Sequence, residues 1–141
     1  MSGVIDAEGG CACGAVRLRA RGAIVAMPQC WCTECQKETG GGPTNSVVLP
    51  DDSVELLSGD VGIFRRRSDA GNEVSHRFCR ICANVLTAEV EGAAYTAVRI
   101  GAFDDTSFFA PQMILFRTSA PAWAHFPDGC QQFDTQPRAA V

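Results

Sequence analysis

The stretch that decides the interpretation of this chain is Cys30-Trp31-Cys32-Thr33-Glu34-Cys35, which holds three of its eight cysteines. Four others form two tight pairs, Cys11-Ala12-Cys13 and Cys79-Arg80-Ile81-Cys82. Side chains on an extended segment alternate, so both sulfurs of a C-x-C motif point to the same face. A C-x-x-C motif on a turn likewise brings two thiolates together. The seven clustered cysteines therefore predict two metal sites, one with four ligands and one with three.

The first and last cysteine pairs are expected to form one site. Gly14 follows Cys13, and Asn84 lies two residues after Cys82; glycine adopts positive φ freely and asparagine tolerates it better than most residues. A strand is predicted after each pair, so two hairpin-like ends could face one ion. We expect a closed, structural zinc site that ties the N-terminal segment to a distant part of the chain, with ligands Cys11, Cys13, Cys79 and Cys82.

Cys30, Cys32 and Cys35 are left for a second, open zinc site. Cys35 is expected in the first turn of a short helix, where the helix dipole lowers the pKa of a thiol. Three thiolates and one open position make a Lewis-acid site. Three thiolates and one Zn²⁺ ion together carry a net charge of −1, which weakens the pull of the ion on water. The fourth position therefore suits a soft ligand or an aldehyde oxygen better than hydrolytic chemistry. This makes the three cysteines the candidate catalytic centre.

Other interpretations of the cysteines remain open from the residues alone. Cys130 could complete the second set and close that site. The three cysteines could instead be metal-free thiols, one of them a nucleophile or redox centre. Iron is chemically possible for sulfur ligands, but the uneven spacing does not resemble two matched iron knuckles. A secreted disulfide framework is disfavoured because a bond within C-x-C is geometrically awkward.

The composition describes one small, mildly acidic domain covering residues 1–141. Twelve basic and 16 acidic residues give a net charge of −4, which does not favour a nucleic-acid partner. The triplet Arg65-Arg66-Arg67 is interpreted as a solvated strand face. Neither a signal peptide nor a membrane span is expected, so a cytoplasmic location with reduced thiols is predicted.

Alternating segments predict a mainly β fold. Strands are expected at residues 16–20, 46–49, 54–57, 61–64, 74–78, 85–90, 95–100 and 113–116. One short helix is expected over residues 34–39, with Thr33 as its N-cap, and a further helical turn over residues 105–109.

Three motifs in this order resemble the glutathione-dependent formaldehyde-activating family, which includes centromere protein V-like domains. They are Gly10-Cys11-Ala12-Cys13-Gly14-Ala15-Val16, the Cys30 to Cys35 stretch and Phe78-Cys79-Arg80-Ile81-Cys82, with further similarity to the tail around Pro127 to Asp134. The resemblance implies a β-tent fold, with a structural zinc on the four-cysteine set and a catalytic zinc on the three-cysteine set. It also implies a carbon–sulfur lyase whose reverse reaction adds glutathione to formaldehyde, giving S-hydroxymethylglutathione.

Two residues depart from the family pattern. Trp31 stands where members often carry histidine; an indole cannot ligate zinc or move a proton, but it could stack on a substrate and change the preferred one. Cys130 stands at a tail position that is usually apolar, which indicates an incidental cysteine. Trp31 and Trp123 are both interpreted first as core or rim aromatics.

Glutathione carries two carboxylates, so its site requires a cation. Lys37, Arg77 and Arg99 are the candidates, while His76 and His125 are expected to have packing or surface roles. Two other functions remain as alternatives: a zinc-stabilised binding module without turnover, and a thiol redox or metal-storage protein.

Overall fold

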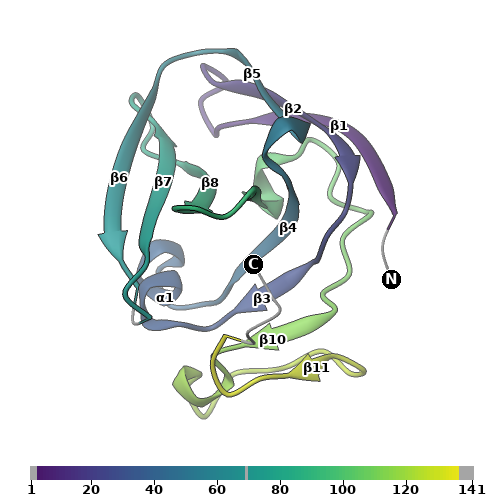
Figure 1. Cartoon of the computed structure of the whole chain (residues 1–141), viewed down its shortest axis with the longest axis vertical. Coiled ribbons are helices and arrows are strands. Elements are labelled where there is room, and N and C mark those ends of the chain that lie inside the picture. The colour runs from purple at the N-terminus through teal and green to yellow at the C-terminus, as the bar shows by residue number, and fades with distance from the viewer. Residues whose placement is uncertain (1–2, 69, 137–141) are drawn as a thin grey trace.

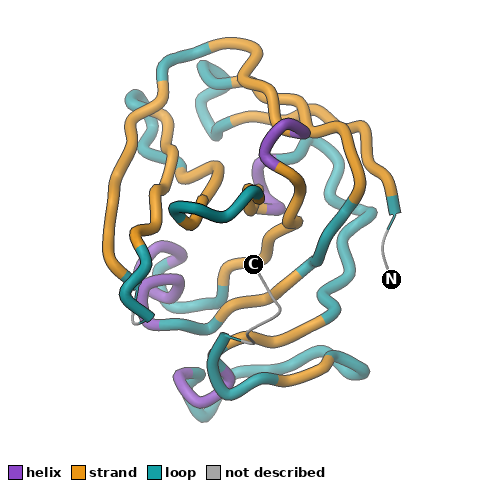
Figure 2. Tube along the Cα trace, viewed as in Figure 1, coloured by secondary structure: helices purple, strands orange, loops and turns teal. Residues whose placement is uncertain are grey.

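The computed structural model of the protein describes residues 3–68 and 70–136. Strands make up 46% and helices 12% of the described residues, which confirms the expected mainly β, small single-domain fold. Figures 1 and 2 show strands curving around the centre of the trace, with helix α1 (Thr33–Thr39) at one side of it. Among the described residues, no helix is long and apolar enough to cross a membrane.

The smaller sheet holds the N-terminal cysteine pair. It contains β1 (Val4–Gly10), β2 (Arg17–Ala23) and β5 (Val54–Ser58), in the antiparallel order β1-β2-β5. The β1–β2 hairpin places Cys11 and Cys13 in its turn. Strand β1 is absent from the predicted strands because Gly and acidic residues replace the β-branched residues typical of a strand.

The larger sheet carries the remaining cysteine clusters. Its order is β11-β10-β3-β4-β9-β8-β7-β6, and β10 runs parallel to β3 and β11 while the other pairs are antiparallel. Its strands are β3 (Pro28–Cys30), β4 (Thr44–Pro50), β6 (Val61–Arg67), β7 (Glu73–Cys79), β8 (Val85–Val90), β9 (Tyr95–Arg99), β10 (Met113–Leu115) and β11 (Gln131–Gln132). The predicted strands are confirmed with ends shifted by a few residues, whereas the short β3 and β11 were not predicted.

The one α-helix among the described residues differs from the prediction at its start. Helix α1 spans Thr33–Thr39, and its N-cap is Cys32, whose sulfur accepts a hydrogen bond from the Cys35 N–H. Thr33 is therefore the first helical residue and not the cap, because a cysteine sulfur takes the place of the usual hydroxyl oxygen. Gly40 ends the helix in the left-handed conformation, at φ 88°.

The helical turn expected over residues 105–109 is wrong. This segment is a turn in which the Thr106 carbonyl accepts from the Phe109 N–H and the Asp105 carboxylate accepts from the Ser107 N–H. The acidic side chain satisfies the backbone locally and so competes with helix formation. The short 3₁₀ helices are elsewhere, at η1 (Asp51–Ser53), η2 (Ile100–Ala102) and η3 (Arg117–Ser119).

The hydrophobic core lies between the two sheets. Val16 and Leu18 from the smaller sheet's hairpin pack in one cluster with Val47, Leu86 and Val98 from the larger sheet. These side chains are almost completely buried. Packing of one sheet on the other brings the β1–β2 turn toward the end of β7, where the last cysteine pair begins.

Candidate metal centres and the adjoining cavity

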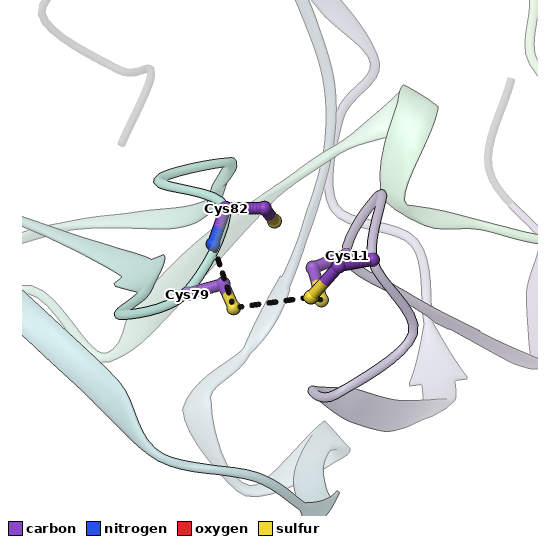
Figure 3. A group of neighbouring side chains, drawn as sticks. Cys11, Cys79 and Cys82 are labelled. Atoms are coloured by element: carbon purple, nitrogen blue, oxygen red, sulfur yellow. Dashed lines mark hydrogen bonds between the residues drawn. The ribbon is translucent and has the colours of Figure 1, made fainter.

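The structure brings the first and last cysteine pairs together as predicted. Cys11 and Cys13 lie in the β1–β2 turn, and Cys79 and Cys82 lie in the turn after β7; Figure 3 shows Cys11 facing Cys79 and Cys82 from a separate loop. The four sulfurs lie within 4.8 Å of one another. The Sγ atoms of Cys13 are 3.5 Å from Cys11 and 3.7 Å from Cys79. A tetrahedron with 2.3 Å metal–sulfur bonds has edges of about 3.8 Å, so these four residues could hold a metal ion.

Backbone N–H groups point at the sulfurs of this cluster. The Val16 N–H donates to Cys11 Sγ at 3.2 Å, and the Ile81 and Cys82 N–H groups lie 3.3 and 3.5 Å from Cys79 Sγ. Chiefly through the Val16 N–H, the pKa of Cys11 is lowered to about 6. These N–H groups thus favour the thiolate of Cys11, the form that binds a metal. The Ala15 N–H also lowers the pKa of Cys13, but contact with the Cys11 thiol and burial outweigh it and raise that pKa to about 11.

The knuckle after Cys82 uses a different residue at positive φ than the sequence indicated. Gly14 has φ 83° as expected, but Ala83 has φ 64°, whereas Asn84 was the residue expected to adopt this conformation. Asn84 instead joins the two knuckles: its Oδ1 accepts from the Ala12 N–H at 3.0 Å, and its Nδ2 donates to the Val85 carbonyl at 3.1 Å. The side-chain amide is thus a direct bridge between the loops that carry the four cysteines.

Replacement of Asn84 by alanine should therefore destabilise the protein by about 0.5–1.5 kcal/mol, because the bridging hydrogen bond is lost. Thermal denaturation of the metal-loaded protein measures the effect. Asn72 lies exposed in another turn and makes its hydrogen bonds through the backbone, so Asn72→Ala is the matched control. Equal melting temperatures for the two variants would contradict the bridging role.

The second cluster also assembles as predicted. Cys30 ends β3, Cys32 caps α1 and Cys35 lies in its first turn, and their sulfurs lie within 4.8 Å of one another. Thr44 Oγ1 donates to Cys35 Sγ at 3.1 Å. Three thiols at this spacing could hold a metal ion with three protein ligands.

Of the three thiols in this cluster, the one with a lowered pKa is Cys32. The expectation that the helix would lower the pKa of Cys35 is wrong. Hydrogen bonds from the Cys30 and Cys35 thiols lower the pKa of Cys32. The pKa of Cys35 is raised to about 11: the Cys30 thiol lowers it, but the contact with Cys32 and burial outweigh that effect. The thiol contacts and burial raise the pKa of Cys30. Three close thiols cannot all ionise alone, so a bound cation would relieve the repulsion among their thiolates.

Two residues singled out in the sequence lie outside both clusters. Cys130 donates its thiol hydrogen to the Pro111 carbonyl at 3.1 Å and belongs to neither group of sulfurs, so it does not close the second site. The side chain of Trp31 is buried, donates to Gln29 Oε1 and contacts the rings of Trp123 and Phe126. This packing matches the core or rim interpretation and gives no support to Trp31 as a stacking surface for a substrate.

A cavity of about 340 Å³ adjoins helix α1. Charged, aromatic and aliphatic residues line it together: Glu34, Lys37, Glu38, Phe64, Arg66, His76, Phe78, Ala83 and Val85. A second cavity of about 360 Å³ shares Glu38, Ala83 and Val85 with the first and also reaches Thr44, the hydrogen-bond donor to Cys35. Cavities of this size suit small-molecule ligands.

The cations near the cavity only partly match the sequence candidates. Lys37 lines it, whereas Arg77 pairs with Glu89 and is not among its lining residues. Arg99 lines the second cavity, but its guanidinium already makes a two-pronged pair with Glu38 at 2.8 and 2.9 Å.

Arg66 is the cation that sequence reasoning missed. The interpretation of Arg65-Arg66-Arg67 as a solvated face holds for the outer two, which are exposed, but Arg66 is half-buried and lines the first cavity. Strand alternation could have indicated that the middle arginine faces the other way. His76 is buried, as expected; it accepts a hydrogen bond from Arg66 and donates none to the residues that the structure describes. His125 is exposed.

Comparison with known proteins places these features in a family. The family model described as glutathione-dependent formaldehyde-activating enzyme matches residues 6–119, a segment that contains both cysteine clusters. The chain belongs to the glutathione-dependent formaldehyde-activating family. Membership agrees with the resemblance carried by the three cysteine motifs, and it indicates an enzyme of this general type.

The fold is also found among solved structures. A crystal structure of a Rhodobacter sphaeroides protein from a structural genomics programme is similar at a TM-score of 0.56 and 15% identity, covering 69% of this chain and 87% of that one. This likeness shows a shared fold alone. No curated protein matches the chain.

Proposed function

We propose that this protein is a zinc enzyme that adds the thiol of glutathione to formaldehyde or a related small aldehyde. Family membership supports the type of reaction. The observation that carries the proposal is the convergence of three sulfurs, from Cys30, Cys32 and Cys35, without a fourth ligand in the group formed by the described residues. A three-ligand centre keeps a position for substrate, whereas a closed four-ligand centre does not.

The two clusters would have different roles. Cys11, Cys13, Cys79 and Cys82 would hold a structural zinc, and Cys30, Cys32 and Cys35 would hold the catalytic one. A zinc ion there would act as a Lewis acid toward a thiol or an aldehyde oxygen. Free cysteines in both sets suit a reducing compartment, so we also propose a cytoplasmic location.

The protein's own groups would fix the ligands and the substrate. The Cys35 N–H and the Thr44 hydroxyl donate to the sulfurs of Cys32 and Cys35, which orients these thiolates. The cavity beside α1 would receive the peptide backbone and carboxylates of glutathione. In the overall reaction a carbon–sulfur bond forms, and the proton of the thiol ends on the former aldehyde oxygen as a hydroxyl.

Exchange spectroscopy by NMR tests the proposal, because it follows formation of S-hydroxymethylglutathione from glutathione and formaldehyde against the uncatalysed background. The two-zinc protein should accelerate exchange, and Cys130→Ser should accelerate it equally, since Cys130 lies in neither cluster. Protein that holds two zinc ions but gives no acceleration would sink the assignment. If both ions were then also resistant to chelation, a binding module without turnover would be favoured.

A further inference from the structure

Arg66 is held in place by a buried chain of polar groups on the cavity wall. Arg66 Nε donates to His76 Nε2 at 3.0 Å. On the other side of the ring, His76 Nδ1 faces Glu38 Oε1 at 3.5 Å. Glu38 is in turn fixed by the two-pronged pair with Arg99. These contacts connect β6, β7, α1 and β9 through side chains alone.

The direction of the hydrogen bonds assigns the state of His76. Because Nε2 accepts from Arg66, the neutral ring must carry its proton on Nδ1, toward the Glu38 carboxylate. Burial first, and then the charges of Arg99 and Arg66, lower the pKa of His76, which favours this neutral state. The His76 residue is 6% exposed and its Nδ1 makes no hydrogen bond with the described residues, so the ring has little contact with solvent.

The Nε contact leaves the two terminal nitrogens of Arg66 without a hydrogen bond to the described part of the chain. Its neighbours on the cavity wall are Phe64 and Phe78, which offer apolar surface, and Lys37 and Glu34, which add a cation and an anion. Arginine presents its terminal nitrogens as a planar fork that matches a carboxylate. A guanidinium whose Nε is already anchored is therefore preorganised to receive an anion with the remaining fork.

We propose that Arg66 is the carboxylate-binding residue for the thiol substrate and that His76 is the residue that positions it. This inference rests on the proposed function for the identity of the thiol. Glutathione carries two carboxylates and one ammonium group, so the mixed lining of Arg66, Lys37 and Glu34 fits a zwitterionic peptide better than a neutral thiol. Arg66 also lies close enough to the cluster that its charge helps to lower the pKa of Cys32.

Binding of S-methylglutathione to the metal-loaded protein, followed by calorimetry, tests the inference without requiring turnover. This probe keeps both carboxylates but has no thiol to ligate a metal. The wild type should bind it, and Arg66→Gln should weaken binding by about 10- to 100-fold, the usual effect of losing a charged hydrogen-bond pair. The diethyl ester of the probe should bind the wild type as weakly as the acid binds Arg66→Gln.

Arg65→Gln is the matched control, because Arg65 is exposed, pairs with Glu73 at 3.4 Å and is absent from the cavity lining. It should bind the probe like the wild type. Wild-type affinity in Arg66→Gln, equal binding of acid and ester, or no binding of the acid by the wild type would each overturn the inference. Arg66-dependent binding together with absent turnover would instead retain the inference and reject the proposed function.

The positioning role of His76 needs a separate variant. His76→Leu removes the acceptor of Arg66 and should weaken binding of the probe about threefold to tenfold, as expected for one hydrogen bond. His76→Gln places an amide oxygen near the position of Nε2 and should restore most of that loss. If His76→Leu and His76→Gln weaken binding equally while both keep the wild-type melting temperature, His76 does not position Arg66.

Discussion

Cys79→Ser is expected to leave an unfolded or aggregated protein. Cys79 Sγ is almost completely buried, accepts two backbone N–H groups and lies 3.7 Å from Cys13 Sγ across the two loops. A structural zinc site contributes about 10–16 kcal/mol of binding energy that is also folding energy. Domains are stable by only about 5–15 kcal/mol in total, so losing this site should exceed the margin. Circular dichroism and zinc analysis of the soluble fraction measure the result.

Cys130→Ser is the control for this experiment, since it makes the same chemical change at a half-buried cysteine outside both clusters. It should fold and keep two zinc equivalents. A Cys79→Ser protein with the wild-type melting temperature and full zinc content would remove the four-cysteine site from the account of stability.

Cys35→Ser is expected to have the second largest effect. Unlike Cys79→Ser, it should abolish activity and leave the fold intact. It removes one of only three sulfurs in the cluster, and a serine hydroxyl is a poor replacement for a thiolate ligand. The variant should hold one zinc equivalent, remain folded and lose all acceleration of the glutathione–formaldehyde reaction. Metal analysis, thermal denaturation and exchange spectroscopy on the same sample separate these three results.

A mild chelator should reproduce this state in the wild type, because a centre with three protein bonds and an open position releases metal more readily than a closed one. The four-cysteine site should keep its metal under the same treatment.

Thr44→Val tests a smaller change at the same site. It removes the hydroxyl that donates to Cys35 Sγ but keeps all three sulfur ligands, so the second zinc should be easier to extract than in the wild type. A second zinc that resists chelation as strongly as the first would contradict an open site.

The grouping of the cysteines into two pairs and one triplet could be predicted because short spacing fixes geometry locally. Two cysteines separated by one or two residues can present both sulfurs to one point, whatever the rest of the fold does. The strands that carry the core could be predicted for the same reason, since period-two alternation is a property of the backbone. The predicted start of helix α1 was wrong because the sulfur of Cys32, and not the hydroxyl of Thr33, accepts the capping hydrogen bond.

Contacts made by residues far apart in the chain could not be predicted in this way. The sequence shows three consecutive arginines, but only the pairing of β6 with β7 turns Arg66 toward His76 and the cavity. Likewise, the sequence does not show that Ala83 adopts positive φ or that the side chain of Asn84 bonds to the opposite loop. The cysteine spacing thus determined by itself that this chain has two thiol pairs and one thiol triplet, whereas the packing of the two sheets decided that the two pairs meet. Only the tertiary structure decided what surrounds them, because those neighbours come from strands whose packing depends on the whole core.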